Sequence, residues 1–111
     1  MRSIVFDEIT PEDMDKLETW LKEQDLQSGI EHLYHFNLPP RLLTPEQQEH
    51  APQCGPFYMA VETGRDFVRL ELLVRAKAIL RCACIAYATA EQRAHMEDYL
   101  ENLLHDLHIA I

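Results

Sequence analysis

Apolar and polar side chains alternate along residues 67–75, and this alternation constrains the fold more than any other feature of the sequence. Successive side chains of a strand point to opposite faces, so the run predicts a half-buried antiparallel strand. Residues 57–62 alternate in the same way, and residues 63–66, Thr-Gly-Arg-Asp, predict a hairpin turn between the two strands. The apolar face of the 67–75 strand consists of Val68, Leu70, Leu72 and Val74.

Weaker patterns predict the rest of the sheet. Residues 79–87 alternate and follow the hairpin, so we expect them to form the third strand of a meander. Residues 30–37 are rich in aromatic residues and are stopped by the prolines at 39–40, which predicts a further strand. Residues 3–6 predict a short edge strand.

Three threonines predict the starts of helices. In each case the hydroxyl can cap a backbone N–H, and a glutamate follows in the first turn, where the helix dipole favours negative charge. The last of the three segments also carries a regular apolar stripe, typical of a long helix packed on a core. The capping residues are Thr10, Thr44 and Thr89, and the predicted helices cover about 11–26, 45–50 and 90–108.

These elements predict one α+β domain over residues 1–111. We expect an antiparallel sheet, a three-strand meander plus one or two further strands, packed on one face by the N-terminal helix and the long C-terminal helix. A chain of 111 residues fits one domain, and no composition shift indicates a boundary.

The charge and the hydropathy exclude two classes of partner. The net charge of −9 repels nucleic acid and anionic lipid. No apolar stretch approaches the roughly 20 residues that span a bilayer, and the acidic residues at 7–8 interrupt any signal-peptide core. We therefore expect a cytoplasmic protein whose three cysteines stay reduced and which binds neither nucleic acid nor membrane.

The cysteines are the residues best suited to bind a metal ion or to act as nucleophiles. Cys82 and Cys84 would share one face of the 79–87 strand, and with Cys54 and a histidine they would match the donor set of zinc. A Cys-x-Cys pair inside a strand is more typical of a packed core, so we expect no metal site and no cofactor. Cys54 has His50 four residues earlier as a candidate base but no cationic neighbour in sequence, which favours an unreactive loop cysteine.

The sheet face turned away from the helices is the candidate binding surface. Its mixture of aromatic, arginine and aliphatic side chains is typical of protein interfaces, unless another segment of the chain covers it. No phosphate loop, nucleophile elbow or zinc-protease motif is present. The predicted interface residues are Tyr58, Arg69, Leu73, Arg75, Arg81, Ile85 and Tyr87.

The leading hypothesis is a noncatalytic protein-binding or adaptor module that acts as a homodimer through this face. Two alternatives remain open. The chain agrees with small acidic secretion-type chaperones in its size, its charge and its expected dimeric state, although no motif carries that resemblance. A metal- or thiol-dependent enzyme would use Cys54, Cys82, Cys84 and a histidine.

Overall fold

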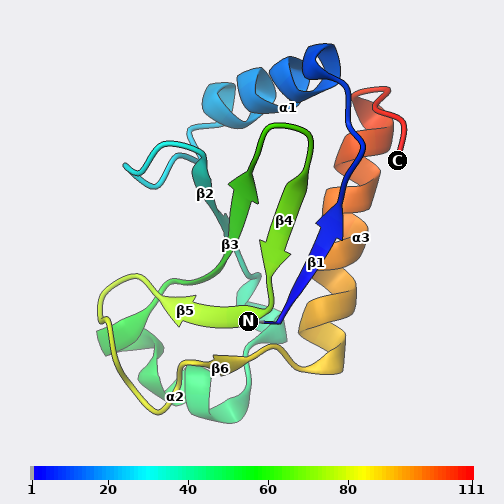
Figure 1. The fold of residues 1–111 in the computed structure, drawn as a ribbon. Coiled ribbons are helices and arrows are strands. Elements are labelled where there is room, and N and C mark those ends of the chain that lie inside the picture. Colours follow the sequence, from blue (N-terminus) through cyan, green and yellow to red (C-terminus); the bar gives the residue numbers. More distant parts are fainter. Residues whose placement is uncertain (1) are drawn as a thin grey trace.

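The computed structural model describes residues 2–111 and confirms the α+β class. One antiparallel sheet has the strand order β1-β4-β3-β5-β6, with β2 paired to β3, and three α-helices accompany it (Figure 1). The strands are β1 (Ser3–Phe6), β2 (Leu33–Asn37), β3 (Phe57–Thr63), β4 (Val68–Glu71), β5 (Leu73–Ala76) and β6 (Ala86–Tyr87). The helices are α1 (Pro11–Glu23), α2 (Pro45–Cys54) and α3 (Ala90–Asp106), with a 3-10 turn at Pro40–Leu42.

The strand predicted over 67–75 is interrupted at Leu72. Its first part, β4, pairs with the end of β3, and its second part, β5, pairs with the beginning of β3. At the break, the Leu72 N–H donates to the carbonyl of Arg2 and the Leu72 carbonyl accepts from the N–H of Ala88, each bond measuring 2.9 Å or less. Figure 1 shows β5 turned across the direction of β4. The alternation of buried and half-buried side chains still runs unbroken from Val68 to Ala76, as predicted.

The strand predicted over 79–87 is wrong for most of its length. Only β6 pairs with β5, and residues 79–85 form a loop closed by a turn in which the Ile85 N–H donates to the Cys82 carbonyl at 3.0 Å. Leu80, expected on the buried face, is 83% exposed. Cys82 and Cys84 therefore do not share a strand face, because no strand exists there.

All three threonine caps are confirmed. The Thr10 hydroxyl accepts from the Asp13 N–H, and Thr44 and Thr89 form complete capping boxes with the glutamines three residues later. Two helix ends differ from the prediction. α1 stops at Glu23, three residues before the predicted end, and Asp25 is the first left-handed residue after it, with φ +58°.

α2 is longer than predicted. It continues through Pro52 to Cys54, where we expected it to end near residue 50. A proline in a helix removes one backbone hydrogen bond, and the helix is retained here because the Gly55 N–H still donates to the Ala51 carbonyl at 2.9 Å. This extra turn places Cys54 in the same helix as His50, which determines the geometry of the candidate metal centre described below.

The core lies between the sheet and the helices. In Figure 1, β1 crosses in front of α3, and α2 lies below β5. The inward side chains of the strands are almost completely buried, as are the apolar stripes of α1 and α3. Among residues 2–111, no helix has the length and hydropathy to cross a membrane. The helical part of the core comprises Met14, Leu17, Leu21, Met96, Leu100, Leu103 and Leu104.

One polar cluster fastens α1 to the sheet. The carboxylate of Glu18 accepts from the hydroxyl of buried Thr63 at 2.6 Å and contacts Nδ1 of His32 at 2.7 Å. Burial opposes ionisation of Glu18, but these two hydrogen bonds outweigh it, so the pKa of Glu18 is lowered from its ordinary value of 4.5. The ionised carboxylate is therefore the form that stabilises the fold.

We predict that Glu18→Gln lowers the free energy of unfolding by about 1.5–3 kcal/mol at pH 7, the usual value for hydrogen bonds to a charged group. A carboxylate with a lowered pKa stabilises the protein above its unfolded-state pKa and loses that effect as the pH falls through the folded value. The difference from wild type should therefore shrink below about pH 4. Urea unfolding between pH 3 and 7 measures it, with exposed Glu23→Gln as control; a gap that stays constant to pH 3 would contradict the assignment.

Candidate metal centre

Four side chains from two distant segments converge behind β5. His50 and Cys54 come from α2, while Cys82 and Cys84 come from the 79–85 loop. One donor atom from each residue lies within 4.8 Å of the donor atoms of the other three. His50 and Cys54 are four residues apart in a helix, so both point from the same face.

The donor set fits a tetrahedral metal ion. Zinc binds thiolate at about 2.3 Å, which places the ligands of a tetrahedron about 3.8 Å apart, inside the observed limit. Three thiolates and one imidazole are donors that favour zinc over magnesium or calcium. All four positions of a tetrahedron are supplied by the protein, which is the pattern of structural rather than catalytic zinc.

The sulfur atoms differ strongly in acidity. The backbone N–H of Cys84 donates to the Cys82 sulfur and, with the neighbouring side chains, lowers the pKa of Cys82 to about 7. Nδ1 of His50 lies 3.1 Å from the same sulfur. Burial raises the pKa of Cys84 to about 12 and also raises the pKa of Cys54. A cation at the centre would favour the thiolate form of all three.

Two buried glutamines hold the loop in place. The amide nitrogen of Gln47 donates to the Cys84 carbonyl at 3.2 Å, and that of Gln92 donates to Gln47 Oε1 at 3.0 Å and to the Leu42 carbonyl at 2.9 Å. Each glutamine oxygen also accepts from the N–H of its own capping threonine. The starts of α2 and α3 are thus joined to the backbone of a candidate ligand, the kind of support that orients metal ligands.

The backbone around Cys54 is equally constrained. Its carbonyl accepts from the Ala78 N–H at 3.0 Å, which brings the chain after β5 beside the end of α2. A Cβ at Gly55 would lie 2.9 Å from the Ala51 carbonyl oxygen, so the chain leaves α2 through a position that only glycine fills without displacement. These contacts bring the two segments together at Cys54 and Cys84.

The structure places the predicted interface residues in two groups. Tyr58, Arg69, Leu73 and Arg75 lie at half-buried, outward positions of β3, β4 and β5, and Tyr87 pairs with Leu73. Arg81 and Ile85 belong to the 79–85 loop instead of a strand: Arg81 is exposed, and Ile85 packs partly against the core.

The sequence contains recognisable metal donors, but the Cys-x-Cys pattern favoured a packed core over a metal site. The prediction placed Cys82 and Cys84 in a strand and ended α2 before Cys54, so the two segments had no reason to meet. The signal that could have indicated the site is His50-x3-Cys54, which forms a ligand pair once α2 extends past Pro52. Comparisons with models of known families, with curated proteins and with solved structures find no match to this chain.

We predict that the three thiols of the metal-free protein react in a defined order. Cys82 is half-buried and has the lowest pKa, so in a chelating buffer iodoacetamide should modify it first, at a rate that rises as the pH passes 7 and the thiolate forms. Buried Cys84 should react last, and added zinc should protect all three. Peptide mass spectrometry measures the order; equal rates, or Cys84 first, would refute it.

Proposed function

We propose that this protein is a noncatalytic protein-binding module whose 77–88 segment is held by a structural zinc ion. The convergence of His50, Cys54, Cys82 and Cys84 carries the metal part of this proposal. The first part of the loop that contains two of these residues has little apolar contact with the core, since Leu80 is 83% and Ile79 is 41% exposed. A metal bound by such a loop contributes to folding because the unfolded chain has no preformed site.

The closed donor set supports a noncatalytic role. A catalytic zinc needs an open position for water or substrate, and four protein ligands fill the tetrahedron. Two of the sulfurs are buried, and the five hollows described along residues 2–111 are lined by other residues than the four donors. A thiol enzyme, the alternative raised by the sequence, would need its nucleophile to reach a substrate.

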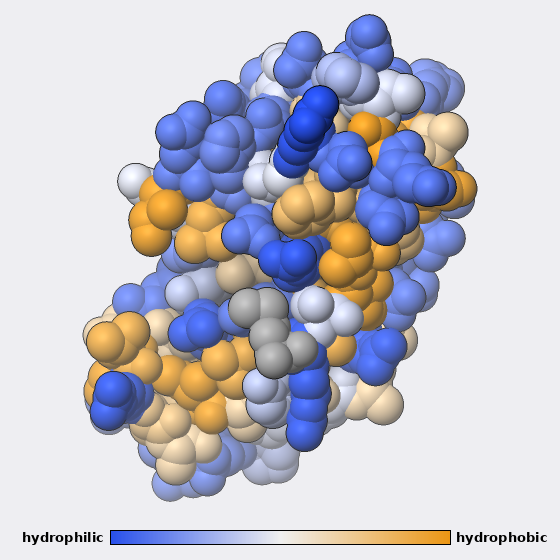
Figure 2. All heavy atoms as spheres, in the orientation of Figure 1, coloured by the Kyte–Doolittle hydropathy of each residue, from blue (hydrophilic) through white to orange (hydrophobic). Residues whose placement is uncertain are grey.

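The outer face of the sheet supports self-association. A hollow of about 310 Å³ lies over β2 and β3, with Ile30 at its rim and Leu33 and Ala60 among its apolar residues. The ring of His35 stacks on Tyr58, with centroids 3.9 Å apart. Figure 2 shows hydrophobic and strongly hydrophilic residues interspersed on the side of the molecule where the strands lie in front.

Charge supports the proposal that a second copy of the chain occupies this face. Arg69 pairs with Glu62, and Arg75 pairs with Glu71 through two nitrogen atoms. The face is therefore locally neutral on a chain with a net charge of −9, so it is where two copies approach with the least repulsion. A twofold dimer needs one self-complementary patch of this kind.

The metal part is tested with protein purified without a histidine tag. We expect one zinc per chain by mass spectrometry of the metal, and the visible absorption of tetrahedral thiolate after replacement with cobalt. Chelation should lower the melting temperature by at least about 10 °C, because one kcal/mol corresponds to several degrees in a domain of this size.

Single substitutions distinguish the residues that bind the metal ion from those that do not. Cys84→Ser and His50→Ala should abolish stoichiometric binding, whereas His105→Ala, on the exposed last turn of α3, should leave it unchanged. Wild-type protein with far less than one metal per chain, and without cobalt absorption, would refute the structural zinc.

We predict that Ala60→Arg converts the dimer to a monomer. Ala60 lines the hollow over β2 and β3 and also a second, smaller hollow beside it on the outer face. A long charged side chain at this position would separate the two copies. The matched control is Ala94→Arg, at an exposed position of α3. Sedimentation equilibrium at micromolar concentration measures the oligomeric state of each protein. A monomeric wild type, or a dimeric Ala60→Arg variant, would rule out this interface.

A further inference from the structure

We propose that the seam between α1 and α3 binds a basic, amphipathic helix of a partner protein. This inference rests on the proposed binding function for its premise but requires neither the zinc ion nor the dimer. The seam lies on the helical side of the molecule, apart from the outer sheet face.

Three hollows join along the seam. The first, of about 370 Å³, is lined by Trp20 and Leu107, and the second, of about 220 Å³, again by Trp20 with Tyr99 and Leu103. The third, of about 260 Å³, continues from Tyr99 to Met96. Trp20 lines the first two hollows and Tyr99 lines the second and third, so the three lie in a row along the seam, and we call this row the groove.

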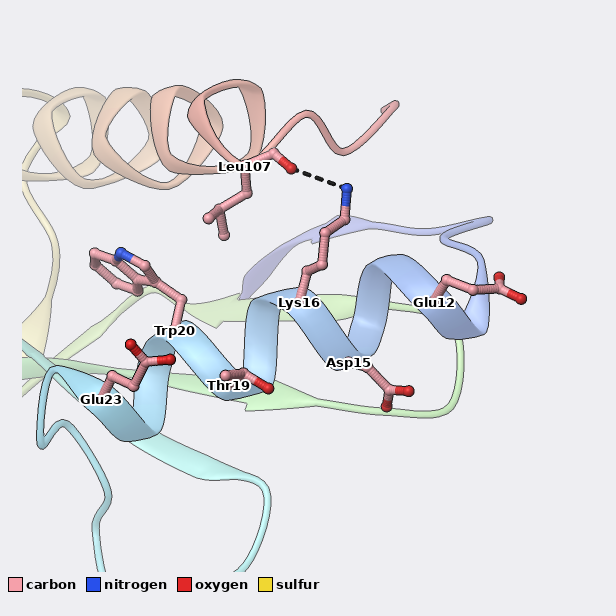
Figure 3. Close-up of a pocket in the computed structure, with 7 residues that line it drawn as sticks. All are labelled: Glu12, Asp15, Lys16, Thr19, Trp20, Glu23 and Leu107. Atoms are coloured by element: carbon pink, nitrogen blue, oxygen red, sulfur yellow. Dashed lines mark hydrogen bonds between the residues drawn. The ribbon is translucent and has the colours of Figure 1, made fainter.

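The floor of the groove is apolar. Figure 3 shows Trp20 pointing from α1 toward α3 and Leu107 pointing back toward α1. Tyr99 is 45% exposed and packs edge to face on buried Phe36, so its ring is held in place while part of it remains open to solvent. The contribution of α3 to the floor runs from Met96 to Leu107, about 16 Å or three helical turns.

The rim of the groove is acidic. Glu12, Asp15 and Glu23 stand along α1 beside the first hollow, and Asp106 borders the second. The one cation of the rim, Lys16, is already engaged: its Nζ contacts the Leu107 carbonyl at 3.0 Å and Asp13 at 3.0 Å. It therefore neutralises Asp13 and the end of α3 and leaves the charge of the other acids uncompensated.

An apolar floor with an acidic rim selects its occupant by charge. A helix with an apolar stripe at positions i, i+4, i+7 and i+11 spans about 16 Å and matches the length of the floor, and lysine or arginine beside that stripe would meet the rim. An anionic membrane surface and an acidic helix would both be repelled. A second copy of this chain, with its net charge of −9, meets the same repulsion here.

The groove can be tested with its own fluorophore, because Trp20 is the only tryptophan of the chain. The probe is a synthetic 18-residue peptide without tryptophan, with leucine at helical spacing and lysine or arginine elsewhere. Its counterpart carries glutamate in place of every basic residue. We expect the basic peptide to shift the Trp20 emission to shorter wavelength at micromolar concentration and the acidic peptide to leave it unchanged.

Two triple variants with the same change of net charge make the test specific. Glu12→Gln/Asp15→Asn/Glu23→Gln should weaken binding of the basic peptide about tenfold, as expected for three exposed charge pairs. The control Asp7→Asn/Glu31→Gln/Asp66→Asn removes three exposed acids that line none of the three hollows and should bind like wild type.

Several outcomes would overturn the proposal. These are no emission shift with the basic peptide at 100 μM, equal binding of the acidic peptide, or equal weakening in both variants. An emission shift that depends on protein concentration alone would also overturn it, since a second copy would then fill the groove. Metal content and sedimentation, measured on the same samples, report on the zinc ion and the dimer independently.

Discussion

The break in the sheet at Leu72 determines where the rest of the chain can go. Its N–H and carbonyl bond to Arg2 and Ala88, so the segment before β1 and the segment after β6 meet at one residue. An uninterrupted strand would keep one register along β3. Instead, the register shifts at the break: Leu70 pairs with Val61, but Arg75 pairs with Tyr58 rather than with residue 56. β5 then carries the chain to the end of α2, where Ala78 bonds to Cys54. The proximity of the two cysteine segments is therefore a consequence of this break.

The 79–85 loop illustrates how a segment with several apolar residues can contact the core through only part of its length. Ile79 and Leu80 are exposed, whereas Cys84 is buried in the core and Ile85 packs partly against it. Polar contacts add to this: the turn at Cys82, the bond from Gln47 to the Cys84 carbonyl, and the cluster of donors around His50. Structural zinc in small domains contributes about 10–16 kcal/mol, far more than these neutral hydrogen bonds.

Local signals predicted the fold class and the helix starts. Alternation identified the inward face of 68–76, and the threonines at 10, 44 and 89 identified the starts of all three helices, because capping and pleating depend on neighbouring residues alone. The break at Leu72 and the loop at 79–85 depend on contacts with residues 2, 54 and 88, which a local pattern does not contain. The donors of the candidate centre were recognised individually, but their convergence required the extra turn of α2.

The charge of this chain is divided between two sides that suit different partners. On the outer sheet face each arginine has an acidic partner, so association there depends on shape and on apolar area. Along the α1–α3 seam the acids outnumber the one lysine, whose charge Asp13 already balances, so association there depends on a cationic partner. Salt screens contacts between opposite charges much more than contacts between apolar surfaces. Raising the ionic strength would therefore release a basic partner from the seam while leaving a dimer through the sheet face intact. Two surfaces of such different charge on one small domain are what the proposed adaptor role requires.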